Sequence, residues 1–130
     1  MHHSQIRSAV RSSVEAGAGD VGIVRVHLQG LIDTPMLDGR LGELIERIEQ
    51  HTSDAVLCDL RAAAGYGPGT PARAREWLMR AHRAGVRRVA LVASSSVLRT
   101  AALMLARNLD LDLRCFLGEA EALRWLNTQN

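Results

Sequence analysis

Short apolar runs alternate along this chain with longer segments in which apolar residues recur at helical spacing. Residues 55–60 and 89–93 are almost continuously apolar, which is typical of strands buried on both faces of a sheet. A helical segment follows each run, so neighbouring strands are expected to be parallel and joined by right-handed crossovers. The alternation therefore predicts an α/β fold built on a mostly parallel sheet.

Two stretches with period-two patterning precede the first helical segment. Apolar and polar side chains alternate over residues 10–15 and again over residues 24–29, on either side of a glycine-rich turn at residues 16–20. This pattern predicts a β-hairpin. Apolar residues within 6–14 also fit one face of a helix, so a helix is the alternative for the first stretch.

The helical segments begin at recognisable capping residues and end at a polar or glycine-containing turn. They are expected to run from Asp33 to about His51, from Thr70 to Gly85, from Ser94 to Leu109 and from Glu119 to Leu126. A last alternating strand is expected at residues 111–117. The sequence thus predicts an α/β domain with a mixed, mostly parallel sheet, an N-terminal β-hairpin and about four flanking helices. We place this single domain at residues 10–130, after a flexible segment at residues 1–9.

Composition narrows the chemistry that is open to the chain. The 130 residues suit one domain, and an aromatic share of 3% implies an aliphatic core. All 16 basic residues are arginine, which excludes a Walker phosphate loop and lysine Schiff-base chemistry. A net charge of +2 does not indicate a nucleic-acid partner, and no run is long enough to span a membrane.

Cys58 and Cys115 lie inside apolar runs, as reduced core cysteines of cytosolic proteins do. The histidines show no metal-ligand spacing, and no Ser/His/Asp or Cys/His arrangement can be assembled. We therefore expect a cytoplasmic protein without a metal, a cofactor or an integral membrane segment.

The order of elements and several local phrases resemble the SpoIIAA-like branch of the STAS superfamily, which is sometimes grouped with the Sec14-like lipid carriers. The resemblance covers nearly the whole chain from about Val10, and the closing Ala-Leu-Arg-Trp-Leu phrase at residues 122–126 is the most telling. The other phrases are Val-Arg-Val-His-Leu-Gln-Gly at residues 24–30, Val-Leu-Cys-Asp-Leu-Arg at residues 56–61 and Arg-Arg-Val-Ala-Leu-Val at residues 87–92.

This resemblance implies a protein that binds a partner and is not an enzyme. Anti-sigma-factor antagonists of the superfamily bind a partner kinase and are switched by phosphorylation of a Ser or Thr at the start of the helix after the central strand. The corresponding stretch is Gly67-Pro68-Gly69-Thr70-Pro71. Thr70 is therefore the candidate phosphoacceptor, although the Ser-Ser-Gly phrase of the family is missing here.

Candidate binding residues gather where strands are expected to end, because ligands of open α/β sheets bind beyond the carboxyl ends of the strands. The loop at residues 61–70 follows one strand, and Ser94, Ser95 and Ser96 follow the next. If the two segments converge, they line one crevice; the alternative is an ordinary crossover loop in which Thr70 caps a helix. The candidate residues are Asp59, Arg61, Tyr66, Gly67, Gly69, Thr70, Ser94, Ser95 and Ser96.

Arginines make the helix after Thr70 basic. Arg73, Arg80, Arg83 and Arg87 are candidates for a contact surface toward an acidic protein or lipid headgroups, and a solvated helix face is the alternative. The sequence predicts a non-catalytic regulatory or protein-interaction module, present as a monomer or homodimer. The alternative is a carrier or sensor that binds a small apolar or lipid-like ligand.

Overall fold

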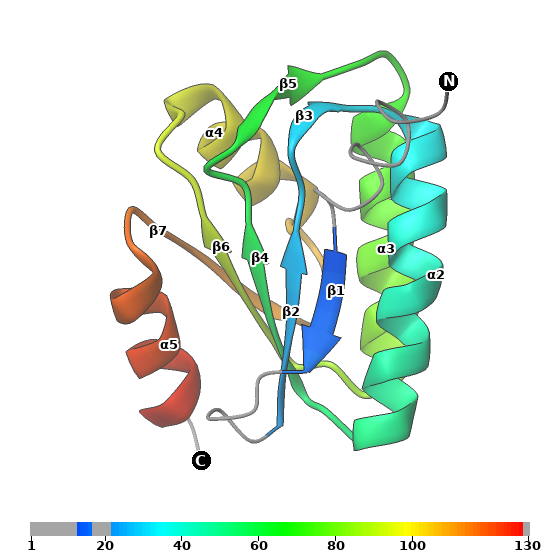
Figure 1. The fold of residues 1–130 in the computed structure, drawn as a ribbon, viewed down its shortest axis with the longest axis vertical. Coiled ribbons are helices and arrows are strands. Elements are labelled where there is room, and N and C mark those ends of the chain that lie inside the picture. The colour runs from blue at the N-terminus through cyan, green and yellow to red at the C-terminus, as the bar shows by residue number, and fades with distance from the viewer. Residues whose placement is uncertain (1–12, 17–21, 129–130) are drawn as a thin grey trace, which may run out of the picture.

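The computed structural model describes residues 13–16 and 22–128, and the side chains of residues 22–127. The predicted flexible segment at residues 1–9 and most of the hairpin turn lie outside the described residues. The elements, in chain order, are β1 (Ser13–Ala16), β2 (Ile23–His27), β3 (Gly30–Ile32), α2 (Thr34–His51), β4 (Ala55–Asp59), β5 (Ala63–Tyr66), α3 (Thr70–Arg83), β6 (Arg88–Val92), α4 (Ser96–Leu105), β7 (Asp112–Phe116) and α5 (Glu119–Thr128) (Figure 1).

Within the described residues the main sheet has five strands, in the order β1-β2-β4-β6-β7. β1 pairs antiparallel with β2, and Val14 faces Val26 in the register, so the predicted hairpin is confirmed where the strand is described. The other three neighbouring pairs are all parallel. The predicted mixed, mostly parallel sheet is therefore confirmed, and the helical alternative for residues 13–16 is wrong.

A second, two-stranded sheet was not predicted. β3 and β5 pair parallel with each other beyond the carboxyl edge of the main sheet, with Ile32 opposite Tyr66. Their sequences, Gly-Leu-Ile and Ala-Ala-Gly-Tyr, are too short and too rich in small residues to show a strand period. The predicted loop at residues 61–70 therefore contains a strand.

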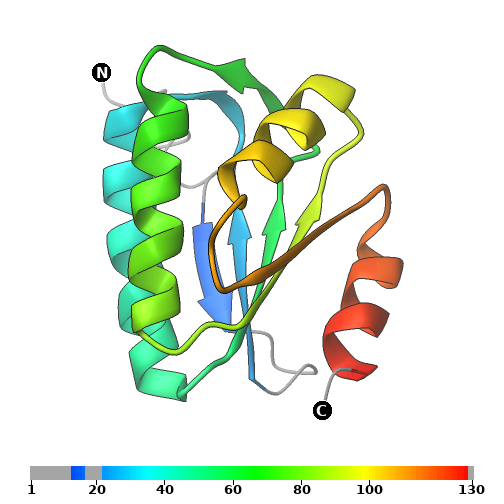
Figure 2. The same cartoon turned by 180° about the vertical axis from the view of Figure 1, so that it is seen from behind.

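The two faces of the main sheet are covered unequally. α2, α3 and α4 pack on one face, and α5 is the one helix of the described residues that packs on the other (Figures 1 and 2). Alternation along β2 decides which side chain faces which layer, because Val24 and Val26 belong to the core under the three helices, whereas Ile23 belongs to the core under α5. The core is aliphatic, as the composition predicts.

The helix ends are set by local chemistry. Asp33 caps α2, since its Oδ1 accepts a hydrogen bond of 2.9 Å from the Met36 amide, and a proline follows in the first turn. Gly85 adopts a φ of 116° directly after α3, where an L side chain would be strained. Thr70 is the first residue of α3, and Gly69 holds the capping position with no side-chain hydrogen bond, so the prediction that Thr70 caps this helix is wrong.

Candidate functional site

Both predicted binding segments leave the main sheet at the same edge. β4 and β6 are parallel neighbours, with Asp59 opposite Val92 at their carboxyl ends. Residues 60–69 follow β4 and lead to α3, and Ser94–Ser96 follow β6 and lead to α4. This edge is where the candidate site can be built.

Asp59 and Arg61 form a two-pronged ion pair at this edge. The Arg61 Nε lies 2.9 Å from Asp59 Oδ1 and its Nη2 lies 2.8 Å from Oδ2, while the Arg61 amide donates to Oδ1 at 3.0 Å. The Arg61 guanidinium, against a smaller opposing effect of burial, holds the pKa of the Asp59 carboxyl below its ordinary value. Asp59 is therefore an ionised anchor for Arg61.

The pair belongs to a wider charged network on the side of the sheet that α5 covers. Arg61 Nη2 lies 3.4 Å from Glu119 Oε1, and Arg25 Nη1 lies 2.8 Å from Glu119 Oε2. His27 Nδ1 lies 3.6 Å from Asp59 Oδ2. The network thus joins β2, the end of β4 and the first turn of α5 through groups of both signs.

The turn that enters α3 is fixed to the end of β3. The amide of Gly67 donates to the Ile32 carbonyl at 2.9 Å, and the Thr70 hydroxyl donates to the same carbonyl at 3.1 Å. Thr70 is 5% exposed, whereas Tyr66 is 39% exposed. Gly69 has a φ of 78°, a conformation that favours glycine. The Thr70 hydroxyl is therefore directed into the protein, and the surface of the turn is formed by its neighbours.

Ser94, Ser95 and Ser96 are exposed at the start of α4. Ser95 caps this helix, because its Oγ accepts a hydrogen bond of 3.2 Å from the Leu98 amide. None of the three serines lines the cavity described next. The structure therefore gives Ser95 a capping role and leaves the Ser94 and Ser96 side chains at the surface.

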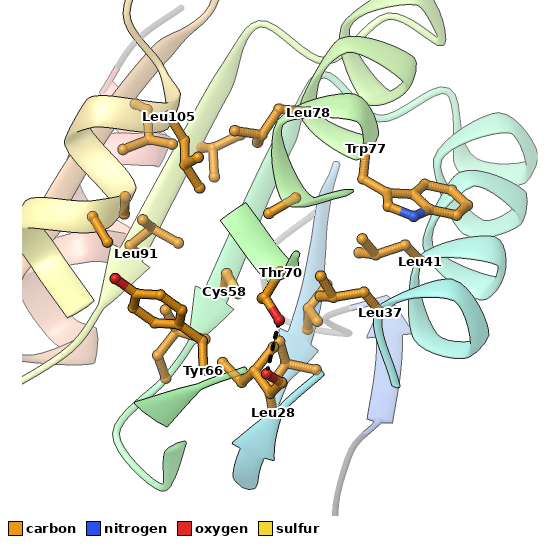
Figure 3. Close-up of a pocket in the computed structure, with 18 of the residues that line it drawn as sticks. Leu28, Leu37, Leu41, Cys58, Tyr66, Thr70, Trp77, Leu78, Leu91 and Leu105 are labelled. Carbon is orange, nitrogen blue, oxygen red and sulfur yellow. Dashed lines mark hydrogen bonds between the residues drawn. The ribbon is translucent and has the colours of Figure 1, made fainter. Parts of the chain in front are cut away.

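A cavity of about 150 Å³ lies between the main sheet and the helices α2, α3 and α4 (Figure 3). The first turns of α3 and α4 both reach it, through Thr70 and Leu98, so the two helix starts share an apolar space. Leu78 of α3 and Leu105 of α4 lie on one side, and Tyr66 contributes its ring from β5 (Figure 3). Its lining is almost entirely hydrocarbon, and apolar matter is what such a space accepts.

Cys58 also lines this cavity. Burial, with a smaller contribution from the Asp59 charge, raises the pKa of the Cys58 thiol to about 12. The thiol is protonated near neutral pH and has little nucleophilic thiolate. Burial likewise raises the pKa of Cys115. Both cysteines are free, and they act as small core residues.

The four arginines of the predicted basic surface have different surroundings. Arg73 donates to both carboxylate oxygens of Asp38, and the Arg80 guanidinium lies 4.3 Å from the centre of the Trp77 ring. Arg83 and Arg87 are exposed, and within the described part of the chain neither takes part in an ion pair. The first two therefore brace α3, and the other two leave their charges open to a contact.

Sequence analysis missed Arg75, which joins two helices. Its Nη1 donates to the carbonyls of Leu105 at 2.7 Å and Arg107 at 2.9 Å, at the carboxyl end of α4. A cation near the last carbonyls of a helix is favourable. No local motif could reveal this role, because tertiary packing alone brings residue 75 to residues 105–107.

Across residues 13–16 and 22–128, no three His, Cys, Asp or Glu side chains are grouped so that they could hold a metal ion. In the same part of the chain, no helix is long and apolar enough to cross a membrane.

The sequence matches the model of the SpoIIAA-like family over residues 23–127. Among curated proteins, none matches it. Solved structures share its fold at low identity. An uncharacterised protein from Shewanella loihica with a SpoIIAA-like fold has a TM-score of 0.65 and 16% identity, over 88% of this chain and 91% of that one.

Two similar structures are anti-sigma factor antagonists. SpoIIAA in its unphosphorylated form has a TM-score of 0.64 and 12% identity, over 89% of this chain and 97% of that one. An antagonist from Mycobacterium paratuberculosis has a TM-score of 0.60 and 16% identity, over 89% and 92% of the two chains. At these identities the likeness is one of fold.

Proposed function

Because this chain belongs to the SpoIIAA-like family, we propose that it is a non-catalytic regulatory module that binds a protein partner at the carboxyl edge of its sheet. The fold is that of anti-sigma factor antagonists. Proteins that have the same fold need not bind the same partners. The support for binding at this edge must therefore come from the surface itself.

The observation that carries the proposal is the pinned turn at residues 66–69. Two hydrogen bonds to the Ile32 carbonyl and the pairing of β3 with β5 hold its backbone, while Tyr66 and Pro68 remain exposed. A surface that is already ordered loses little conformational entropy on binding. Aromatic side chains in such positions are frequent anchors of protein interfaces.

The environment of Thr70 bears on the phosphorylation switch. A phosphate on its hydroxyl would break the hydrogen bond to the Ile32 carbonyl and force the side chain out of its buried position. We propose that the partner recognises the pinned turn, and that a phosphate at Thr70, where a kinase adds one, acts by releasing that turn.

Affinity capture from the source organism tests the binding surface. The wild-type chain and Tyr66→Ser are compared with Leu117→Ser, a control that also removes an exposed apolar side chain, 62% exposed, before α5. We expect the wild type and the control to recover the same protein, and Tyr66→Ser to lose it. Recovery that is equal for all three would contradict the proposal. The switch would be excluded if Thr70→Ala captured as much partner as the wild type does, both with and without kinase treatment of the two proteins.

The cavity supports a second candidate, a carrier or sensor of a small apolar ligand. Its volume of about 150 Å³ lies below the roughly 300 Å³ at which pockets for drug-sized ligands begin. Apolar cavities of roughly this size can accept a molecule such as benzene. The space therefore favours a small hydrocarbon group, and a larger lipid would have to move α3 and α4 apart.

Native mass spectrometry of freshly purified protein tests this candidate. We expect a bound apolar mass in the wild type that is absent from Ala101→Leu, because residue 101 lines the cavity and a larger side chain would fill it. Tryptophan fluorescence gives a second readout, since Trp77 lines the cavity, whereas Trp125 belongs to α5 and packs in the core on the other face of the sheet. No bound mass, together with no change in Trp77 emission on adding benzene, would exclude the carrier.

A further inference from the structure

Basic charge is concentrated in one stretch of this chain. Residues 70–109, which form α3, β6 and α4, contain eight arginines and a single acid, Glu76, although the net charge of the whole chain is only +2. The rest of the chain must therefore be acidic overall.

Four of these eight arginines make contacts with other groups of the chain. Arg73 and Arg88 pair with Asp38 and Asp54, Arg75 caps α4, and Arg80 lies over the Trp77 ring. Arg83, Arg87, Arg99 and Arg107 take part in no ion pair within the described residues.

Exposed apolar side chains lie on the same two helices. Val97, Leu103 and Met104 on α4 are 66%, 49% and 59% exposed, and Met79 on α3 is 40% exposed. Met104 follows Val97 by seven positions, which is nearly two helical turns, so these two side chains share one flank of α4 about 10 Å apart. Scattered exposed apolar residues need no explanation, but a group on adjoining helices marks an interaction surface.

The hydrogen bonds from Arg75 to the carbonyls of Leu105 and Arg107, here called the Arg75 clamp, hold the two helices that carry these side chains together. Arg75 binds the carbonyl of Arg107, so the second turn of α3 lies against the end of α4. Met79 and Arg83 follow Arg75 on α3 at intervals of four residues, and Arg107 follows Met104 by three. Figure 2 shows α3 and α4 adjacent on the same face of the molecule. We call these side chains the α3–α4 surface: Met79, Arg83, Val97, Met104 and Arg107.

We propose that the α3–α4 surface docks an acidic amphipathic helix of a partner protein. An apolar stripe beside a junction of two helices fits a helix whose anchors recur at i, i+3 and i+7. Methionines adapt their shape to such anchors. The unpaired arginines favour glutamates or aspartates beside the anchors, since complementary charge steers and orients an encounter. The inference rests on the proposed role in protein binding, and it adds a second surface and the chemistry of the partner.

A second copy of this chain fits the surface less well. Its α2 is the longest helix and exposes Glu46 and Glu49, yet none of the exposed large apolar residues in the described part of the chain lies on α2. That helix offers charge without anchors. Nucleic acid likewise offers charge without apolar anchors. Binding of a DNA oligonucleotide is therefore one of the outcomes that the test distinguishes.

The test uses a synthetic helical peptide with leucines at i, i+3 and i+7 and glutamates on its flanks. Its fluorescence anisotropy is followed as the full chain is added, and amide NMR maps the contact. We expect saturable binding whose shifts fall on α3 and α4. Val97→Ser with Met104→Ser should weaken binding about tenfold or more. Arg107→Glu should weaken it and reduce its dependence on salt.

Arg47→Glu is the matched control, because it makes the same charge change on an exposed residue of α2. Thermal melts establish that every variant is folded. The inference fails if the peptide does not bind, if Arg47→Glu weakens binding as much as Arg107→Glu, or if a DNA oligonucleotide or a leucine-free acidic peptide binds as tightly. These outcomes are independent of Tyr66-dependent capture, so failure of the turn surface and failure of the α3–α4 surface are distinguishable.

Discussion

Side chains pack differently on the two faces of the main sheet. Under α5, small side chains alternate with large ones such as Trp125, and Ala90, Ala122 and Val92 are completely buried. Under α2, α3 and α4, larger side chains such as Leu78 and Leu105 surround a cavity of about 150 Å³. Alanines at the contact, such as Ala90 and Ala122, let a single helix approach the sheet closely, whereas three helices with different directions leave a space where they meet.

This difference indicates on which face of the sheet a change in side-chain volume should cost less stability. The core under α5 contains fully buried side chains, and in such a core each methyl group matters. The three-helix face contains spare volume, and the Arg75 clamp rather than close packing bridges part of the distance between α3 and α4. Both proposed surfaces, the pinned turn and the α3–α4 surface, lie on elements of the looser face.

Leucine-to-alanine substitutions should separate the two faces most clearly. Leu57, 1% exposed, packs under α5, and Leu57→Ala should lower the free energy of unfolding by about 3 kcal/mol. Leu105→Ala should lower it by only about 1 kcal/mol, because the half-buried Leu105 side chain already borders empty space. Urea denaturation measures both, and equal losses would mean that the faces are packed alike.

Enlarging an alanine on each face should give effects of different sign. Ala122→Leu inserts a larger side chain under α5 and should cost about 1–3 kcal/mol of stability. Ala101→Leu fills the cavity and should leave stability unchanged or raise it by up to about 1 kcal/mol. Both sites are helical, so intrinsic helix propensity is matched. A large loss for Ala101→Leu would show that the space is closed in solution.

The sequence predicts the regular elements well and the site only in part. Apolar residues at helical spacing locate α2 and α3, and continuous apolar runs locate β4 and β6, because the side chains that become buried in these elements must be apolar. β3 and β5 escape prediction, since three or four residues rich in glycine and alanine carry no period. In the charged network Glu119 pairs with Arg25 and Arg61, which lie 94 and 58 positions away, and the Arg75 clamp reaches carbonyls 30 and 32 positions away; only the fold brings these groups together.

Removal of the clamp should loosen α4 without unfolding the α5 face. Arg75→Ala should cost about 1–2 kcal/mol, because two carbonyls at the end of α4 lose a charged donor. Amide hydrogen exchange should accelerate in α4 and remain unchanged in α5. Arg75→Lys keeps the charge but not the fork of the guanidinium, and it should fall between the wild type and alanine. Exchange that rises equally in both helices would mean that the clamp is only one part of global stability.

The smallest expected effect belongs to the charged network on the α5 side of the sheet. Hydrogen bonds from Arg61 hold the pKa of Asp59 below its ordinary value of 3.8. A carboxylate of this kind stabilises the folded state fully above the unfolded pKa, and the contribution is lost as the pH falls through the lower folded pKa. Asp59→Asn should therefore be less stable than the wild type by up to about 1 kcal/mol at pH 6, and the difference should shrink below about pH 4.

Urea midpoints measured between pH 6 and pH 2.5 check this expectation for Asp59→Asn. Asp110→Asn, at an exposed aspartate that forms no ion pair within the described residues, controls for the loss of one negative charge. A gap between wild type and Asp59→Asn that stayed constant with pH would assign the effect to packing. In that event the charge of Asp59 would contribute nothing to stability, and the network would be a passive feature of the surface.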